Sequence, residues 1–470
     1  MDWVVLAATV IAVSLVAGIV IHLVSVLSSE EDKHDGFFTK FLVILSFIFA
    51  SLNVLMLPFD VAITQMDLRN IHHPLDVILI WTVIIVGVVF LCLVVCPFVL
   101  TYCEVGSQEG ATTYRRVALA TAVVVLVVAL SSAAVYAGWH TSGFATVNFA
   151  EYSISGTPAT SFELIKEFSS DSQTVSVRMK VSPFVYLVAS LCVGGWVFLS
   201  IFGGIGLVAV PQELLLYFRD RPRPITASEY AYRRDEVARE SQRLIDKGRM
   251  IEEASGGHSY GGHIRKVLAF RQAVRELEAY HTTIEVSYHQ QGGTVLNNYL
   301  CLLEGIVFTF LSIMWSLHVV VFNVSHVHTL LSSTLRSINE LSVTLCVTVY
   351  SCLAFYLVLC TLKGCIKLGG NLALYHIYPI DINSTSTASL LFNAILFLAT
   401  STTVLQFCVY SFRDYAVNTW TNVLFSVFVL RLDGIKYVIF YSQYLLVVVA
   451  CLALMWLLVS PRRYTRISRW

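Results

Sequence analysis

Long apolar runs separated by short polar stretches fill most of the chain. A helix needs about 20 consecutive apolar residues to cross the hydrocarbon core of a bilayer, and nine such runs occur. They are Trp3–Leu27, Phe41–Thr64, Leu75–Cys103, Val117–Gly138, Phe184–Val210, Leu296–Phe322, Leu341–Ile366, Ala388–Phe412 and Val438–Val459. No basic segment precedes the first run, so we interpret it as a retained span rather than a cleaved signal peptide. The pattern predicts an all-α polytopic membrane protein of nine transmembrane helices.

The composition supports this prediction. The 470 residues are 56% hydrophobic and only 13% charged, against about 25% charged residues in soluble domains. Too little polar surface remains to cover a water-soluble globule, so the lipid bilayer is the expected environment. The formal net charge is +0, which gives no indication of a nucleic-acid partner.

The distribution of lysine and arginine predicts the orientation of the spans. Residues 212–295 and the C-terminal tail 460–470 fall on the side that is rich in these residues, which is therefore expected to be cytosolic. The N-terminus then faces the lumen or the cell exterior. The predicted organisation is five helices in 1–211, a cytosolic domain in 212–295, four helices in 296–459 and the tail.

The cytosolic domain reads as a helical hairpin. Thr226 and Glu229 have the spacing of a capping box, and Tyr230, Val237, Leu244 and Ile251 follow at seven-residue intervals. After a glycine-rich turn, apolar positions alternate steps of three and four up to Tyr288, a heptad pattern typical of coiled coils. A lone hairpin buries little surface, so it is expected to pack on the membrane domain, on a second copy of the chain in a homodimer, or on a partner. A simple spacer is the alternative.

A glycine-rich run and a basic segment mark the cytosolic end of the fifth span. Small residues allow close helix packing, and proline is expected to break the helix near the membrane boundary. Basic side chains just beyond it suit the anionic inner leaflet. They are interpreted either as a basic segment that merely flanks the membrane span or as a specific phosphoinositide-binding site. These residues are Gly203, Gly204, Gly206 and Pro211, followed by Arg219, Arg221 and Arg223.

Polar residues inside the spans are candidates for a solute pathway, because intramembrane polar groups are costly and often functional. The candidates are Asn53 and Asp60 in the second span, Glu304 in the sixth, and Asn393 and Gln406 in the eighth. The alternative is hydrogen bonding between helices. Between the last two spans, Trp420–Leu430 is apolar but too short to cross, so we expect it to lie in or dip into the outer leaflet.

Enzyme chemistry finds little support in the sequence. Nucleophile-elbow, zinc-protease and P-loop motifs are missing, so no catalytic residue, metal site or cofactor is predicted. In the tail, Tyr464 and Ile467 have the spacing of a tyrosine-based sorting signal. Endosomal sorting and simple contact of Ile467 with the membrane surface are the two interpretations.

Several segments together resemble the LIMR family, the limb-region-like, lipocalin-interacting membrane receptors. The segments are Leu57–Ala62, Cys96–Glu104, the stretch from the glycine-rich run to Tyr230, Ser389–Asn393, Gln406–Cys408 and Gly434–Tyr437. The resemblance implies nine spans with a large cytosolic loop after the fifth. It also implies either transport, as in a lysosomal family member needed for cobalamin export beside an ABC transporter, or a lipocalin-type endocytic receptor or signalling scaffold. The expected location is an endolysosomal or plasma membrane. Expected partners are an ABC transporter or a cytosolic adaptor bound through the hairpin, and an outer ligand at Trp139–Pro183.

Overall fold

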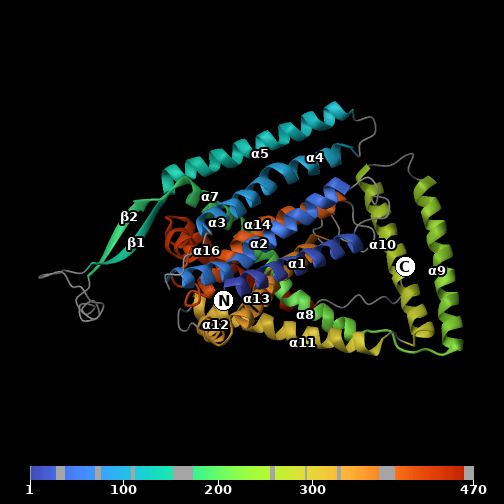
Figure 1. The fold of residues 1–470 in the computed structure, drawn as a ribbon. Coiled ribbons are helices and arrows are strands. Elements are labelled where there is room, and N and C mark those ends of the chain that lie inside the picture. Colours follow the sequence, from blue (N-terminus) through green and yellow to red (C-terminus); the bar gives the residue numbers. More distant parts are fainter. Residues whose placement is uncertain are drawn as a thin grey trace, which may run out of the picture. The chain divides into compact units, whose positions relative to one another are not determined.

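The computed structural model describes residues 2–27, 37–68, 76–106, 112–151, 173–253, 260–291, 294–324, 330–369 and 387–459 (Figure 1). Within these ranges, eight helices are long and apolar enough to cross a membrane, and they coincide with the second to ninth predicted spans. The first predicted span coincides with helix α1 (Asp2–Leu27). The prediction of an all-α polytopic membrane protein is therefore confirmed. The tail 460–470, with Tyr464 and Ile467, lies outside the described residues.

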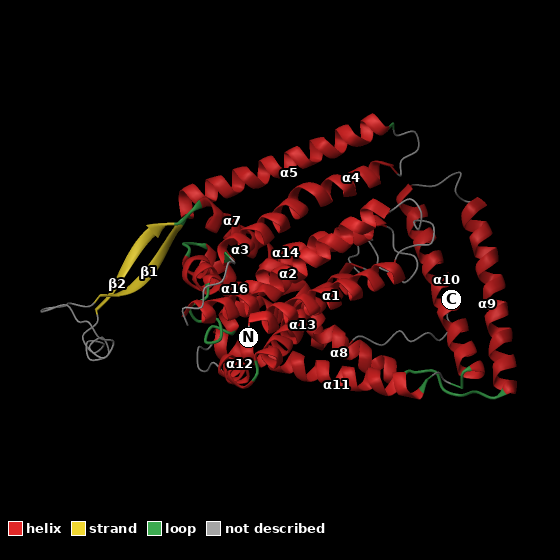
Figure 2. Cartoon of the chain, viewed as in Figure 1, coloured by secondary structure: helices red, strands yellow, loops and turns green. Residues whose placement is uncertain are grey.

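The described elements are helices apart from one pair of strands (Figure 2). After α1 come α2 (Phe37–Leu68), α3 (Val77–Phe90), α4 (Cys96–Gly106), α5 (Thr113–Ser142), β1 (Phe144–Glu151), β2 (Gln173–Lys180), α7 (Pro183–Phe198), α8 (Gly204–Arg219), α9 (Ala227–Glu253), α10 (Tyr260–His289), α11 (Val295–His318), α12 (Leu330–Leu341), α13 (Val343–Gly369), α14 (Thr387–Ser411), α15 (Trp420–Asn422) and α16 (Ile435–Val459). Short π-helical turns join several of these helices, namely η2 (Leu91–Val95), η4 (Leu199–Gly203), η6 (Val319–Val324) and η7 (Val423–Phe428), and η8 (Val429–Arg431) is a 3₁₀ turn. The chain forms two compact units, residues 1–209 with 311–454 and residues 210–310 with 455–470.

Helix α14 is the central element of the first unit. In an apolar stretch of 18 residues within α14, 78% of the residues are buried, against 6% in the corresponding stretch of α5. It packs against α2 and α7, and Leu391, Ala394 and Leu398 are fully buried in the core that it shares with α2 and α4. A helix that is buried on all sides belongs at the centre of a bundle. The exposed apolar surface of α5 is the surface expected to face lipid.

Prolines inside two spans are compensated by hydroxyl groups from other helices. Proline lacks the N–H that would bond the carbonyl four residues earlier. For Pro58 in α2 that carbonyl belongs to Val54, and the Tyr350 hydroxyl of α13 donates to it at 2.9 Å. For Pro211 in α8 the carbonyl belongs to Leu207, and the Ser312 hydroxyl of α11 donates to it. The predicted helix break at Pro211 is therefore wrong, because α8 continues to Arg219 once the orphaned carbonyl has a donor.

Removal of one of these hydroxyl groups is expected to destabilise the bundle. In Tyr350→Phe the Val54 carbonyl stays buried without a donor, which costs about 1–3 kcal/mol. Thermal unfolding of the purified protein in detergent measures the loss. Tyr136→Phe is the matched control, because Tyr136 is 66% exposed and its substitution is expected to leave the midpoint unchanged. Equal midpoints for the two variants would contradict the compensating role of Tyr350.

A two-stranded antiparallel sheet occupies the predicted outer loop between α5 and α7. The register pairs Ala145 with Met179, Val147 with Val177 and Phe149 with Val175, so the apolar positions of both strands share one face. At its base, the Trp139 indole N–H donates to the Val181 carbonyl at 2.9 Å. The sequence analysis did not predict these strands, although the period of two in Gln173–Lys180 was a visible signal.

The second unit contains the predicted hairpin. Helices α9 and α10 lie side by side (Figure 1). The rings of Tyr230 and Tyr288 stack at 4.3 Å, and Phe270 contacts Gly248, so the two helices are antiparallel. Burial raises the pKa of Tyr280 above its ordinary value, and the charge of Glu236 adds to the rise. The cytosolic location of this hairpin stays a prediction.

Candidate functional site

Buried polar side chains of α14 bond to two neighbouring helices within the first unit. The Asn53 amide of α2 donates to Ser401 Oγ and to Thr402 Oγ1, both at 3.0 Å. On the other side of the helix, the Trp196 indole N–H of α7 donates to Gln406 Oε1 at 2.8 Å. Buried polar groups that bond to one another in this way fix the register between helices.

The Asp60 carboxylate of α2 sits at the start of the short helical segment 420–431. One of its oxygens, Oδ2, accepts from the Thr421 backbone N–H at 3.0 Å and from the Thr421 hydroxyl at 2.6 Å. Asp60 is only 1% exposed, and it forms no ion pair with any residue that the structure describes. A helix N-terminus provides unpaired N–H groups and a positive dipole end, so a carboxylate is stabilised there without a cation. The carboxylate therefore anchors the segment to α2.

The segment itself is a short helix with one buried and one open side. Thr419 caps its start by accepting from the Asn422 N–H at 3.1 Å. Leu424, Phe425 and Val429 are at most 2% exposed. The segment is too short to cross a bilayer, as the sequence predicted. At its far end the chain meets the base of β1, where the Asp433 N–H donates to the Phe144 carbonyl at 2.9 Å.

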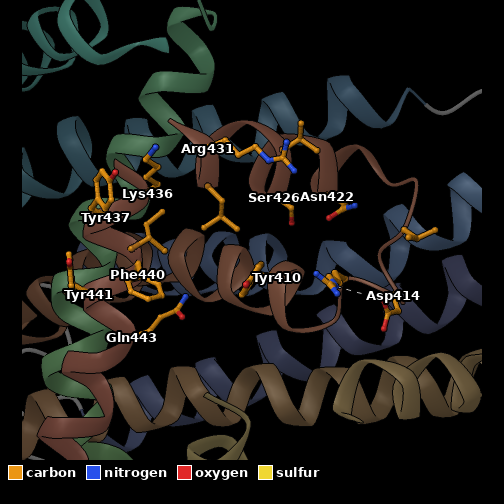
Figure 3. Close-up of a pocket in the computed structure, with 15 residues that line it drawn as sticks. Tyr410, Asp414, Asn422, Ser426, Arg431, Lys436, Tyr437, Phe440, Tyr441 and Gln443 are labelled. Atoms are coloured by element: carbon orange, nitrogen blue, oxygen red, sulfur yellow. Dashed lines mark ion pairs between the residues drawn. The ribbon is translucent and has the colours of Figure 1, made fainter. Parts of the chain in front are cut away.

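The open side of the segment forms one wall of a pocket of about 790 Å³. The other walls come from the end of α14, the loop after it and the start of α16 (Figure 3). The wall formed by the segment consists of Asn422, Ser426, Val427, Leu430 and Arg431, and the opposite wall includes Tyr410, Tyr437 and Phe440. Pockets of about 300–1,000 Å³ commonly hold small organic ligands.

Two polar side-chain atoms of the pocket residues have no hydrogen-bond partner among the described residues. Asn422 Oδ1 and Ser426 Oγ are buried, and neither has a hydrogen-bond partner among the described residues. Figure 3 shows both side chains on the side of the segment that faces Tyr410. Gln443 of α16 also lines the pocket and is only 4% exposed. Buried polar groups in native proteins are normally bonded, so this pocket offers bonding capacity to a ligand.

The structure brings some of the predicted site residues together and separates others. Asn53, Asp60 and Gln406 all lie in the first unit, and each hydrogen-bonds to a residue of another element. Asn393 is buried, and its amide donates to the Ser389 carbonyl of its own helix at 2.7 Å. Glu304 belongs to the second unit, where its side chain is exposed. The polar residues of the first unit thus make separate internal contacts, and Glu304 takes part in none of them.

The predicted packing glycines lie at close helix contacts of the first unit. A Cβ atom added at Gly206 would overlap the Cys360 backbone carbonyl of α13, and one at Gly204 would lie 2.8 Å from the Leu446 carbonyl of α16. At Gly203 the nearest atom is a methyl group of Leu199 on the same chain segment, at 3.0 Å. Gly204 and Gly206 therefore sit where only a hydrogen atom fits.

The predicted basic residues lie in the second unit. Arg219 forms two hydrogen bonds of 2.7 Å with the neighbouring Asp220 carboxylate. Arg221 lies over the Phe218 ring at 4.2 Å and donates to the Phe218 carbonyl, whereas Arg223 is exposed. Two of the three arginines are thus held by contacts within the segment, which favours a basic flank over a preformed phosphoinositide site.

The sequence analysis missed the pocket, although one signal was present. Arg413, Arg431 and Lys436 lie close together in the sequence, on the predicted outer side, which is otherwise poor in basic residues. Their placement around one space depends on the fold of segment 420–431, which sequence periodicity does not reveal.

The fold and this site define a multi-pass α-helical membrane protein with a short helix held beside the bundle core and a pocket against it. The family model described as LMBR1-like membrane protein matches residues 3–285 and 231–458, so the chain belongs to this family. The resemblance to the LIMR family is thereby confirmed.

Curated relatives carry the same family name over nearly their whole length. A LIMR family protein of Dictyostelium discoideum is 29% identical, with 96% of each chain covered. One from Oryza sativa subsp. japonica is 27% identical, with 94% of each chain covered. One from Arabidopsis thaliana is 26% identical over 88% of this chain and 87% of that protein. No solved structure matches the chain significantly.

Proposed function

We propose that this chain is a nine-span, transport-related membrane protein that captures a solute on the outer or lumenal side and acts beside an ABC transporter. The pocket at segment 420–431 carries the proposal, because it has the size of a ligand site and buried polar atoms without protein partners. A purely structural scaffold has no need for such a pocket. An endolysosomal or plasma membrane is the proposed location.

The arrangement of the polar interior favours capture over an independent carrier. A carrier requires polar groups that are available to the solute along its path. Asn53, Asp60 and Gln406 each use one polar atom in a bond to a neighbouring group of the first unit, so only their second polar atoms, Asn53 Oδ1, Asp60 Oδ1 and Gln406 Nε2, lack a partner among the described residues. In this proposal the ABC transporter moves the solute across the membrane. The predicted cytosolic hairpin is the proposed contact with that transporter.

Purification of the tagged full-length chain from native membranes tests this proposal. We expect an ABC transporter to co-purify, and to be lost when residues 226–288 are replaced by a short flexible linker. Cobalamin retention in the same cells is the next assay, because the family resemblance names that solute. Recovery of receptor or adaptor components in place of a transporter would contradict the proposal. As a control, the chain that carries the linker in place of residues 226–288 must reach the same membrane.

A lipocalin-type endocytic receptor is the second candidate, and the strands β1 and β2 favour it. They form an ordered antiparallel pair in the predicted outer loop, where Val175 and Val177 expose 38% and 42% of their surface. An exposed apolar strand face suits contact with a protein ligand. Replacement of Val175 and Val177 by threonine is expected to abolish ligand uptake if the receptor function holds, and to leave transport unchanged if it does not.

A further inference from the structure

We propose that the pocket at segment 420–431 binds an amphiphilic organic anion, with its acidic group held by Arg431 and Lys436 and its apolar part against the aromatic wall of α16. This inference rests on the proposed function in that it names the ligand class of the same pocket. It depends on the pocket alone and not on any transporter partner.

The charge of the lining residues favours an anion. Three basic side chains, Arg413, Arg431 and Lys436, line the pocket together with a single acidic one, Asp414. Two of these basic side chains have acidic neighbours. Arg413 Nε lies 3.9 Å from Asp414 Oδ1, and Lys436 Nζ lies 4.0 Å from Asp433 Oδ1. Arg431 forms no ion pair with any acidic residue that the structure describes, and it is partly buried. An arginine in such a position is suited to two parallel bonds with a phosphate or carboxylate.

The remaining polar groups of the pocket can complete the bonding of such an acid. Ser426 lies one turn before Arg431 along the segment, and its buried hydroxyl lacks a partner among the described residues. Asn422 lies one further turn back and adds an amide. A ligand acid bound by Arg431 would also satisfy the Ser426 hydroxyl, which otherwise bears a desolvation cost.

The opposite wall and the size of the pocket exclude a bare inorganic ion as the best ligand. Tyr437, Phe440 and Tyr441 of α16 line that wall, and Figure 3 shows them grouped on one side of the space. A volume of about 790 Å³ greatly exceeds the volume of one water molecule, about 30 Å³ in the liquid. Basic and aromatic residues together are typical of the membrane interface, where amphiphiles concentrate.

Titration of the purified full-length chain with dioctanoyl phosphatidic acid tests the inference, with bound ligand counted by native mass spectrometry. We expect one molecule to bind, and dioctanoylglycerol, which has the same tails without the phosphate, to bind at least about tenfold more weakly. Arg431→Gln and Lys436→Gln are each expected to raise the dissociation constant about tenfold or more. Ser426→Ala is expected to raise it less, because the lost group is neutral.

Arg336→Gln is the matched control. Arg336 is basic, exposed and on the same predicted side, but it pairs with Glu340 at 3.4 Å and does not line the pocket. Equal affinity in the Arg431, Lys436 and Arg336 variants would overturn the inference, as would equal binding of dioctanoylglycerol. Thermal unfolding identifies a variant that fails to fold. If either Arg431→Gln or Lys436→Gln does so, the affinity of the other variant decides whether the inference holds.

Two further arms identify the source of the ligand. If inorganic phosphate competes as strongly as the amphiphile, the apolar part of the inference is wrong. If dioctanoyl phosphatidic acid no longer binds to the chain in nanodiscs that contain dioleoyl phosphatidic acid, the ligand is a membrane lipid; unchanged binding there indicates entry from water. Loss of transporter co-purification with intact binding refutes only the proposed function, and the reverse result refutes only this inference.

Discussion

The Gly206→Ala substitution is expected to destabilise the bundle by about 3 kcal/mol, near the upper end for overpacking. The added methyl group would overlap the Cys360 backbone carbonyl, and a backbone atom within a helix cannot move aside as a flexible side chain can. Helices α8 and α13 would have to separate along their contact. The measurement is the thermal unfolding midpoint in detergent, together with the yield of monodisperse protein.

Gly194→Ala provides the control on the same chain segment. A Cβ atom at Gly194 would meet no atom of the described residues within 4 Å, and alanine is favoured over glycine in a helix interior by about 1 kcal/mol. This variant is expected to be as stable as the unsubstituted protein or slightly more so. If Gly206→Ala tolerates heat as well as Gly194→Ala does, the close approach of α8 and α13 is wrong.

Asp60→Ala is expected to release segment 420–431 from α2 and to cost about 2–3 kcal/mol. The substitution removes both bonds to Thr421. The buried Thr421 backbone N–H loses its acceptor, and the Thr421 hydroxyl keeps only its bond to Thr419 Oγ1 at 3.1 Å. A buried polar group that loses its partner costs about 1–3 kcal/mol. Hydrogen–deuterium exchange reports the effect directly, as faster exchange of the amides in 420–431. Amides of α5, which packs mainly on α4, serve as the internal reference.

Two milder variants separate the hydrogen bonds from the charge. Asp60→Asn keeps a carbonyl oxygen that can accept from the Thr421 N–H, so exchange in the segment is expected to rise only slightly. Thr421→Val removes the hydroxyl alone, which is expected to cost about 1 kcal/mol. If Asp60→Asn frees the segment as fully as Asp60→Ala, the negative charge at the helix start is the dominant contribution. Unchanged exchange in Asp60→Ala would refute the anchor itself.

Sequence reasoning located the spans well because each is defined by its own residues. An apolar run such as Leu296–Phe322 requires no knowledge of its neighbours, and the structure places a candidate span at Val295–Phe322. The hairpin helices were predictable for a similar reason, since the cap at Thr226 and the spacing of Tyr230 and Val237 are local.

The error at Pro211 has a non-local cause. The residue that compensates for the missing N–H is Ser312, about a hundred positions further along the chain. No local rule connects the two, so proline was interpreted as a break. The same holds for Pro58 and Tyr350. Prolines within spans are tolerated when another helix supplies a donor, and this requires knowledge of the packing.

The candidate site was predictable only in part. Asp60 was identified because a lone carboxylate in a span is costly, but its partner Thr421 lies 361 positions away. The segment 420–431 was correctly interpreted as too short to cross, yet its helical fold and its pocket depend on packing against α2 and α14. Nothing local in the sequence shows that Arg431 and Lys436 share a pocket with Ser426.

The most direct test of the account is a cryo-EM structure of the full-length chain, bound to an antibody fragment, in nanodiscs that contain phosphatidic acid. The account predicts that segment 420–431 is helical, that Thr421 bonds to Asp60, and that additional density lies between Arg431 and the aromatic residues of α16. A segment detached from Asp60, or a pocket filled by the protein's own side chains, would contradict it.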